Sequence, residues 1–137
     1  MKEIITHSPE ETFSLGEKIG QRCLGGEVIL LLGNLGSGKT RLTQGIARGL
    51  GIKTKVVSPT FNIMKVYQSR VGFLCHIDAY RLNSGHDLEM IGIDDYLNKK
   101  DTVVVIEWAE RVKNIWPKNQ IKIELKTIEG GRKIKIS

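Results

Sequence analysis

The chain has 137 residues, of which 40% are apolar and 26% charged, and this balance is ordinary for a water-soluble globular protein. Its length suits one hydrophobic core, so we expect a single domain over residues 1–137. There is no apolar run near the roughly 18 residues of a membrane span and no apolar stretch typical of a signal peptide. We therefore expect no membrane association, a cytoplasmic location and two reduced core cysteines.

The net charge of +6 arises in residues 111–137, which contain eight basic and two acidic side chains. A basic segment can bind nucleic acid or an acidic partner. However, apolar and charged residues alternate over 121–126, which is typical of a strand with one solvated face. The alternation favours the strand interpretation, and direct contact with nucleic acid remains a secondary hypothesis.

The first elements expected in chain order are a short strand over residues 1–6 and a helix that ends near Cys23. Ser8 is predicted to be the N-cap of this helix, with Pro9 at its first position and Glu11 closing a capping box. Three of its side chains are expected to face the core, namely Phe13, Ile19 and Cys23.

A strand is expected over residues 27–32, and its lack of polar alternation predicts burial on both faces. A second amphipathic helix follows over residues 39–50. Further along, a first hairpin is expected to pair residues 62–68 with 72–78, and a second to pair residues 120–126 with 132–136. Between the hairpins we expect two short helical turns, over 87–90 and 94–98, and an apolar strand over 102–107. The pattern predicts an α/β protein whose mixed sheet has a parallel centre and antiparallel additions.

The stretch between the first buried strand and the second helix fits the phosphate-binding motif G-x-x-x-x-G-K-[ST]. Its residues are Gly33, Asn34, Leu35, Gly36, Ser37, Gly38, Lys39 and Thr40. Glycines allow backbone N–H groups to surround a triphosphate, and the helix that follows offers its positive dipole end. The lysine is expected to pair with the β- and γ-phosphates of a nucleoside triphosphate, and the threonine hydroxyl to bind Mg²⁺.

Two other strands end in a carboxylate, Asp78 and Glu107. Both acids are expected at the carboxyl edge of the sheet, where the phosphate loop also lies, as candidates for metal binding or for orienting water. Thr60, in the loop after the second helix, is a candidate switch residue; a plain turn built on Ser58 and Pro59 is the alternative.

Some residues resemble functional groups without the required context. Residues 98–101 spell N-K-K-D, the guanine-reading pattern, but they precede an apolar strand instead of following one. We interpret them as a turn. His76 lies on the same strand face as Asp78, yet a buried structural histidine is the favoured interpretation, and Trp108 is interpreted as packing or as part of a contact surface.

Four stretches together resemble the TsaE (YjeE) family of small bacterial ATPases, which are required for threonylcarbamoyladenosine (t6A) modification of tRNA. They are Gly33–Thr40, Ser58–Phe61, His76–Leu82 and Ile106–Glu110. The H-x-D-x-Y-R and I-E-W sequences make the resemblance specific, and it extends over nearly the whole chain. It departs only at Asn34 and Ser37, where the family often has Asp and Ala.

The resemblance implies a P-loop NTPase-like three-layer fold and a set of site roles. Lys39, Asp78 and Glu107 are then catalytic, and Thr40, Asp78 and Glu107 serve Mg²⁺. Thr60 belongs to a switch-like loop that contacts ATP. Arg132, in the last hairpin, and the segment near Ser8 and Pro9 would close over the adenine.

The resemblance also implies TsaB and TsaD proteins as partners, with tRNA reached through their complex. The chain has little beyond a nucleotide-binding core, which independently favours an ATPase that acts on another protein. Two alternatives remain open: a small-molecule kinase, and a nucleotide-dependent binding module in which hydrolysis is incidental.

Overall fold

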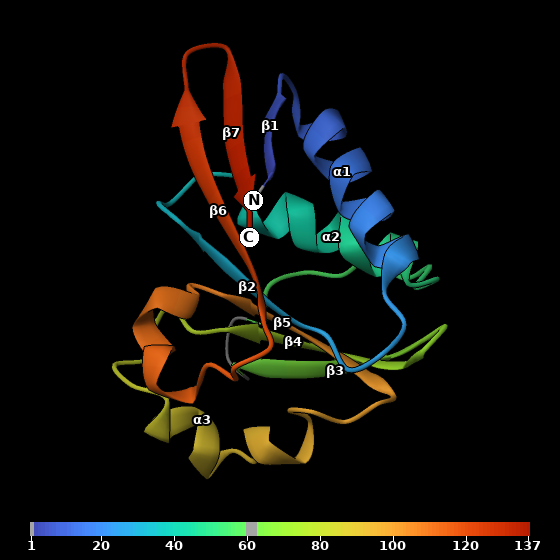
Figure 1. Cartoon of the computed structure of the whole chain (residues 1–137), viewed down its shortest axis with the longest axis vertical. Helices are drawn as coiled ribbons and strands as arrows, with labels where there is room; N and C mark the ends of the chain where they lie inside the picture. Colours follow the sequence, from blue (N-terminus) through green and yellow to red (C-terminus); the bar gives the residue numbers. More distant parts are fainter. Residues whose placement is uncertain (1, 60–62) are drawn as a thin grey trace.

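The computed structural model describes residues 2–59 and 63–137, and these are organised around one mixed β-sheet (Figure 1). The strand order is β1-β7-β6-β2-β5-β4-β3. Strands β6, β2, β5 and β4 run parallel, whereas β3, β7 and β1 add to the two edges by antiparallel pairing. The strands are β1 (Lys2–Thr6), β2 (Val28–Gly33), β3 (Met64–Ser69), β4 (Gly72–Asp78), β5 (Thr102–Glu107), β6 (Ile121–Ile128) and β7 (Gly131–Ile136).

Helical segments cover both faces of the sheet, so the predicted three-layer α/β fold with a mixed sheet is confirmed. Helices α1 (Pro9–Arg22) and α2 (Lys39–Gly49) pack on one face, and the shorter α3 (His86–Met90), η1 (Ile93–Asp95) and η2 (Ala109–Ile115) pack on the other (Figure 1). None of the helices in the described part of the chain combines the length and the apolar character needed to cross a membrane.

The two central strands are buried on both faces, as their unbroken apolar sequences predict. Along β2, Ile29 and Leu31 join the core beneath α1 and α2, whereas Val28 and Leu30 join the core beneath the short helices. Every residue of β5 is buried. Ligand sites of parallel sheets lie at the carboxyl ends of the strands, and here those strands are well packed on both faces.

Helices α1 and α2 cross at glycines, which the periodicity did not predict. The buried residues of α1 are Thr12, Gly16 and Gly20, whereas the expected core residues Phe13 and Ile19 are only partly buried. A Cβ atom on Gly20 would overlap the carbonyl oxygen of Ile46 in α2. The backbones therefore approach closely, and bulkier side chains are displaced to the rim of the contact.

The N-cap of α1 and the turn before β5 are confirmed, whereas the predicted capping box is displaced by one residue. The N–H of Glu11 donates to the hydroxyl of Ser8, the N-cap, at 3.1 Å. The carboxylate of Glu11 accepts from the N–H of His7 at 3.0 Å, one residue before the position expected in a capping box. Residues 98–101 form a turn before β5, as interpreted. In contrast, the sequence pattern did not predict η2.

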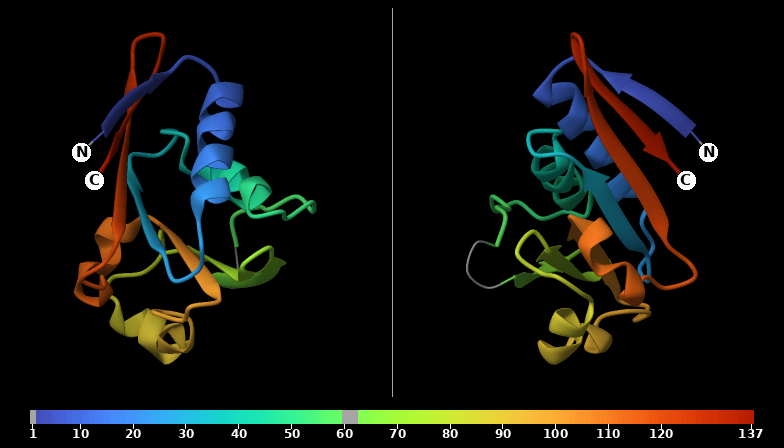
Figure 2. Two further views of the ribbon diagram at one scale, coloured as in Figure 1. Left: turned by 45° about the vertical axis from the view of Figure 1, so that its right-hand side comes forward. Right: turned by 90° about the vertical axis from the view of Figure 1, so that its left-hand side faces the viewer.

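The β6–β7 hairpin carries much of the basic excess and extends beyond the helices with β1 beside it (Figure 2). Along β6, Ile123 and Leu125 are buried while Lys126 is exposed. The expected one-sided strand is therefore confirmed.

Because α1 and α2 cross at glycines, replacing one of these glycines by alanine should destabilise the protein, whereas the same change usually stabilises a helix. Gly20→Ala should lower the free energy of unfolding by about 1–3 kcal/mol, because the new methyl group meets backbone that cannot move independently. Elsewhere in a helix the same change stabilises by up to about 1 kcal/mol. Urea unfolding measures the effect, with Ser14→Ala on the exposed face of α1 as the control. Equal midpoints for the two variants would contradict the close crossing.

The two free cysteines predict low thiol reactivity. Burial raises the pKa of Cys75, and burial assisted by the Glu27 carboxylate raises that of Cys23, to about 12 in each case. Neither thiol of the folded protein should react with a thiol reagent at about pH 8, and both should react in denaturant. Native labelling as rapid as denatured labelling would contradict this.

The cysteines of the unfolded chain ionise at lower pH than those of the folded protein, so the free energy of unfolding should fall as pH rises above about 9.

Candidate functional site

The candidate phosphate loop connects β2 to α2 and leaves the N-terminal amides of α2 free of a side-chain cap. Gly33, Gly36 and Gly38 have φ angles of 153°, 78° and 100°, all positive, which glycine adopts without steric cost. Gly38 is the N-cap of α2 and supplies no side-chain cap, and the first turn contains no acidic residue. In α1, by contrast, a serine cap and two glutamates occupy these places. The dipole and amides of α2 are thus available to phosphate.

The amine of Lys39 is held inside the loop. It donates to the carbonyl oxygens of Gly33 at 2.6 Å and Asn34 at 2.9 Å, and the residue is only 5% exposed. The amine also lies 3.9 Å from the centre of the Trp108 ring. Burial lowers the pKa of Lys39, although the nearby Glu110, Glu107 and Asp78 carboxylates counteract this. A buried cation beside an anion-binding helix end is well placed to pair with a phosphate.

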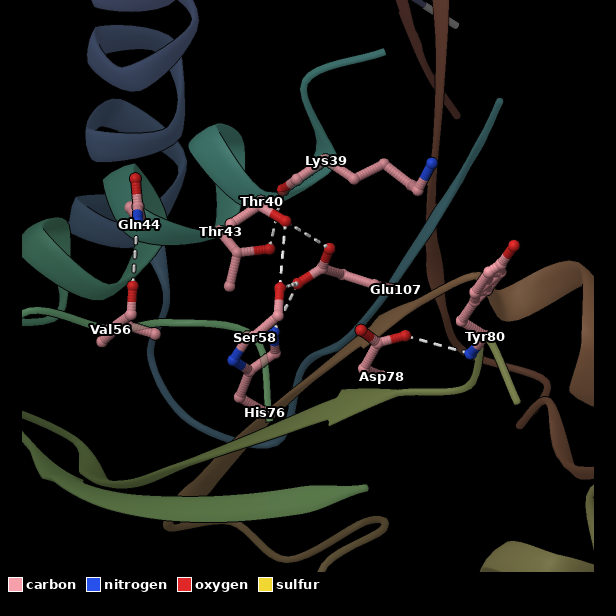
Figure 3. A network of polar contacts seen from close by, with 10 residues as sticks. All are labelled: Lys39, Thr40, Thr43, Gln44, Val56, Ser58, His76, Asp78, Tyr80 and Glu107. Carbon is pink, nitrogen blue, oxygen red and sulfur yellow. Dashed lines mark hydrogen bonds and ion pairs between the residues drawn. The ribbon is translucent and has the colours of Figure 1, made fainter. Parts of the chain in front are cut away.

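A polar cluster joins the second residue of α2 to the end of β5 (Figure 3). The hydroxyl of Thr40 donates to Oε1 of Glu107 at 3.0 Å and lies 3.0 Å from the hydroxyl of Ser58. On the other carboxylate oxygen, Nε2 of His76 is 2.6 Å away. Glu107 is 2% exposed, so its charge is compensated by these donors instead of by bulk water.

Asp78 lies beside this cluster, because it pairs in register with Glu107 across β4 and β5. Its carboxylate accepts from the N–H of Tyr80 at 3.0 Å (Figure 3). Burial raises the pKa of Asp78, an effect that the Tyr80 hydrogen bond opposes and the Glu107 charge reinforces. Asp78 and Glu107 face one pocket of about 510 Å³ together with the loop residues 35–40.

The structure brings Arg132 to the loop as well. Its guanidinium donates to the carbonyl oxygen of Gly36 at 3.1 Å, across 96 residues of sequence. Arg132, Pro9 and Gly38 line a second pocket of about 530 Å³ next to the loop. The structure therefore brings the loop, strand-end and hairpin candidates to one edge of the sheet, while their roles stay predictions. Thr60 lies outside the described residues.

Four residues enter the site that sequence reasoning did not assign to it: Ser58, His76, Trp108 and Glu110. Glu110 accepts from the N–H of Gly33 at 3.3 Å, and its other carboxylate oxygen is buried without a partner in the described part of the chain. Trp108 has a φ angle of 59° and stacks on Tyr80 at 4.8 Å. Two signals in the sequence pointed to them: each of the four lies within three residues of a predicted site residue, and each lies inside a stretch that carries the resemblance described above.

The donor set fits Mg²⁺ in a nucleotide site. Among residues 2–59 and 63–137, no group of three or more His, Cys, Asp or Glu side chains could hold a metal ion. Mg²⁺ beside phosphates needs only one or two protein oxygens, because phosphates and water complete its shell. The hydroxyl of Thr40 and the carboxylate of Glu107 are such oxygens, adjacent to the α2 N-terminus.

Comparison with known proteins identifies one family. The family model described as "Threonylcarbamoyl adenosine biosynthesis protein TsaE" matches residues 6–134. A relative from Treponema pallidum, named as tRNA threonylcarbamoyladenosine biosynthesis protein TsaE, is 37% identical over 97% of this chain and 98% of its own length. A Bacillus subtilis protein of the same name is 38% identical, over 88% of this chain and 75% of its own length.

The fold is also that of a solved relative. The crystal structure of Bacillus subtilis YdiB superposes with a TM-score of 0.82 at 33% sequence identity, over 98% of this chain and 83% of that one. The likeness therefore covers the sheet, both helix layers and the loop together.

The contact between Lys39 and Trp108 predicts that nucleotide binding changes the tryptophan fluorescence. Phosphate should draw the Lys39 amine away from the indole ring, so ATP with Mg²⁺ should change tryptophan fluorescence. A Trp116→Phe variant should retain most of the change, and Trp108→Phe should lose it. Equilibrium dialysis verifies that each variant still binds ATP. A full response from Trp108→Phe would contradict the assignment of the pocket.

Proposed function

The chain belongs to the TsaE family, and on that premise we propose that it is a Mg²⁺-dependent ATPase that supports threonylcarbamoyladenosine modification of tRNA. One observation carries the ATPase proposal: the buried Lys39 amine and the Thr40–Glu107 hydrogen bond lie together at the N-terminus of α2. A cation, a metal-binding hydroxyl and an acid at one helix end are the parts that phosphoryl transfer requires.

The loop and Lys39 are assigned to the ATP phosphates. The N-terminal amides of α2 surround the anion, and the Lys39 amine exchanges its bonds to the Gly33 and Asn34 carbonyl oxygens for phosphate oxygens. Desolvation strengthens this pairing, because the amine is already buried before it gains an anionic partner. The hydroxyl of Ser37, 3.3 Å from the amine, is a further polar contact inside the loop.

When bound with ATP, Mg²⁺ would supply positive charge that offsets the negative charge developing on the phosphates during hydrolysis. Thr40 and Glu107 are assigned to hold the ion, since their oxygens already lie together. Asp78 is assigned to the same region as a metal-linked or water-orienting acid, because it faces the pocket one strand away from Glu107. Proton transfer from water suits this residue, whose pKa is raised by burial.

The second pocket is assigned to the adenine and ribose. It lies between the start of α1 and the β6–β7 hairpin and shares Gly38 and Arg41 with the phosphate pocket, so one nucleotide can extend through both. Its lining includes Pro9 and Arg132, both from the segments that the sequence assigned to the base. The hydrogen bond from Arg132 to Gly36 joins a residue that lines the second pocket to a residue that lines the phosphate pocket.

We assign TsaB and TsaD proteins as partners on the basis of family membership. Independent support comes from the rim of the phosphate pocket, where Leu35 is 80% exposed and Tyr80 44% exposed. Exposed aromatic and aliphatic side chains are typical of protein contact surfaces. A partner seated there would exclude water from the reacting phosphate and could complete the active site, as GTPase-activating proteins do.

Lys39→Ala should lower the rate of ATP hydrolysis by about 100-fold or more, because it removes the cation that stabilises charge on the phosphates. Phosphate release is measured with Mg²⁺, by the chain alone and then with purified TsaB and TsaD. The wild-type rate should be low alone and should rise with the partners. Lys53→Ala, an exposed lysine outside the pocket, should behave as wild type.

Three results would overturn parts of this proposal. An unchanged rate with TsaB and TsaD would contradict the partner coupling. Transfer of phosphate to a small acceptor would indicate a kinase instead. Full support of tRNA modification by a Glu107→Ala variant that still binds ATP would indicate a binding module in which hydrolysis is incidental.

A further inference from the structure

The contact between His76 and Glu107 is a short hydrogen bond between two side chains that are almost completely buried. Nε2 of His76 lies 2.6 Å from Oε2 of Glu107, and the two side chains are 0% and 3% exposed. The residues come from neighbouring strands, β4 and β5, whose pairing is parallel and in register. The bond therefore joins two paired strands of the sheet.

The second ring nitrogen indicates what the histidine does. Nδ1 of His76 is buried and has no hydrogen-bond partner in the described part of the chain. Buried polar atoms are nearly always paired, so a histidine kept only to fill the core would be costly here. Its neighbours on β4, Leu74, Cys75 and Ile77, are fully buried and show that the strand accommodates smaller or apolar side chains. Among the residues that the structure describes, the bond to Glu107 is thus the one polar interaction of this ring.

This bond limits how the Glu107 carboxylate can turn. The terminal torsion of a glutamate is broad and roughly two-fold, so an unrestrained carboxylate would sample many orientations. Here His76 engages Oε2, and Oε1 faces the hydroxyl of Thr40 at 3.0 Å. The histidine thereby directs one defined oxygen toward the N-terminus of α2.

We propose that His76 is a positioning residue that orients Glu107 for Mg²⁺ bound with the nucleotide. This inference rests on the proposed function, in which Thr40 and Glu107 hold the ion. Carboxylates that bind metals are commonly oriented by such outer hydrogen bonds, and removing one weakens metal affinity by about 10–100-fold. His76 itself touches neither nucleotide nor metal in this scheme.

The test measures ATP binding at equilibrium as a function of Mg²⁺ concentration, with radiolabelled ATP and no turnover. His76→Phe, which fills the space without a donor, should raise the half-saturating Mg²⁺ concentration by about 10-fold or more. Binding of ATP in EDTA should change by less than about 2-fold, because the Lys39 contacts remain. His76→Gln restores a donor and should recover much of the Mg²⁺ affinity.

Leu74→Val is the matched control, because Leu74 is buried on the same strand and the same face as His76. It should leave the Mg²⁺ dependence unchanged even if it lowers the unfolding temperature. An unchanged Mg²⁺ dependence in His76→Phe would overturn the positioning role alone. An equal loss of ATP binding with and without Mg²⁺ would indicate a purely structural role. Wild-type binding that is indifferent to Mg²⁺ would instead overturn the metal assignment of Glu107, and this inference with it.

Discussion

The parallel pairing of β2 with β5 is the constraint on which the site depends. It pairs Leu31 with Glu107, so the loop that leaves β2 and the acid that ends β5 reach the same edge of the sheet. Both strands are buried on two faces, which makes their register costly to change. A slip of one residue would turn the Glu107 carboxylate away from α2 and into the opposite apolar core, where it would lose its bonds to Thr40 and His76.

The packing of α2 completes this arrangement. Its close crossing with α1 holds the helix in place, with its N-terminus beside the end of β2. The same helix pair brings Pro9, at the start of α1, to the pocket beside the loop. The glycines at the crossing thus serve the site indirectly, because a wider crossing would move the start of α2 away from Glu107.

Buried charge is concentrated at this edge of the sheet. Lys39 and Glu107 are almost fully buried, and Glu110 is oriented onto the first glycine of the loop. Buried ion clusters contribute little to stability unless every group is well hydrogen-bonded. Within residues 2–59 and 63–137, Nδ1 of His76 and one oxygen of Glu110 have no hydrogen-bond partner. Such an arrangement is poorly explained by stability and is well explained by binding of a charged ligand.

The amino-acid sequence by itself determined the α/β class, the mixed sheet, the phosphate-loop motif and the family. These depend on short-range information: apolar runs mark buried strands, and a run of eight residues specifies the loop. It did not predict η2 or the glycine crossing, and it placed Phe13 and Ile19 deeper than they lie, because a helix stripe does not reveal how closely a partner helix approaches. The roles of the site residues stay predictions, including that of Thr60, which lies outside the described residues. Only the tertiary structure decided that His76 contacts Glu107, that Glu110 contacts Gly33 and that Arg132 contacts Gly36, because these partners are 31, 77 and 96 residues apart and meet only through strand order and register.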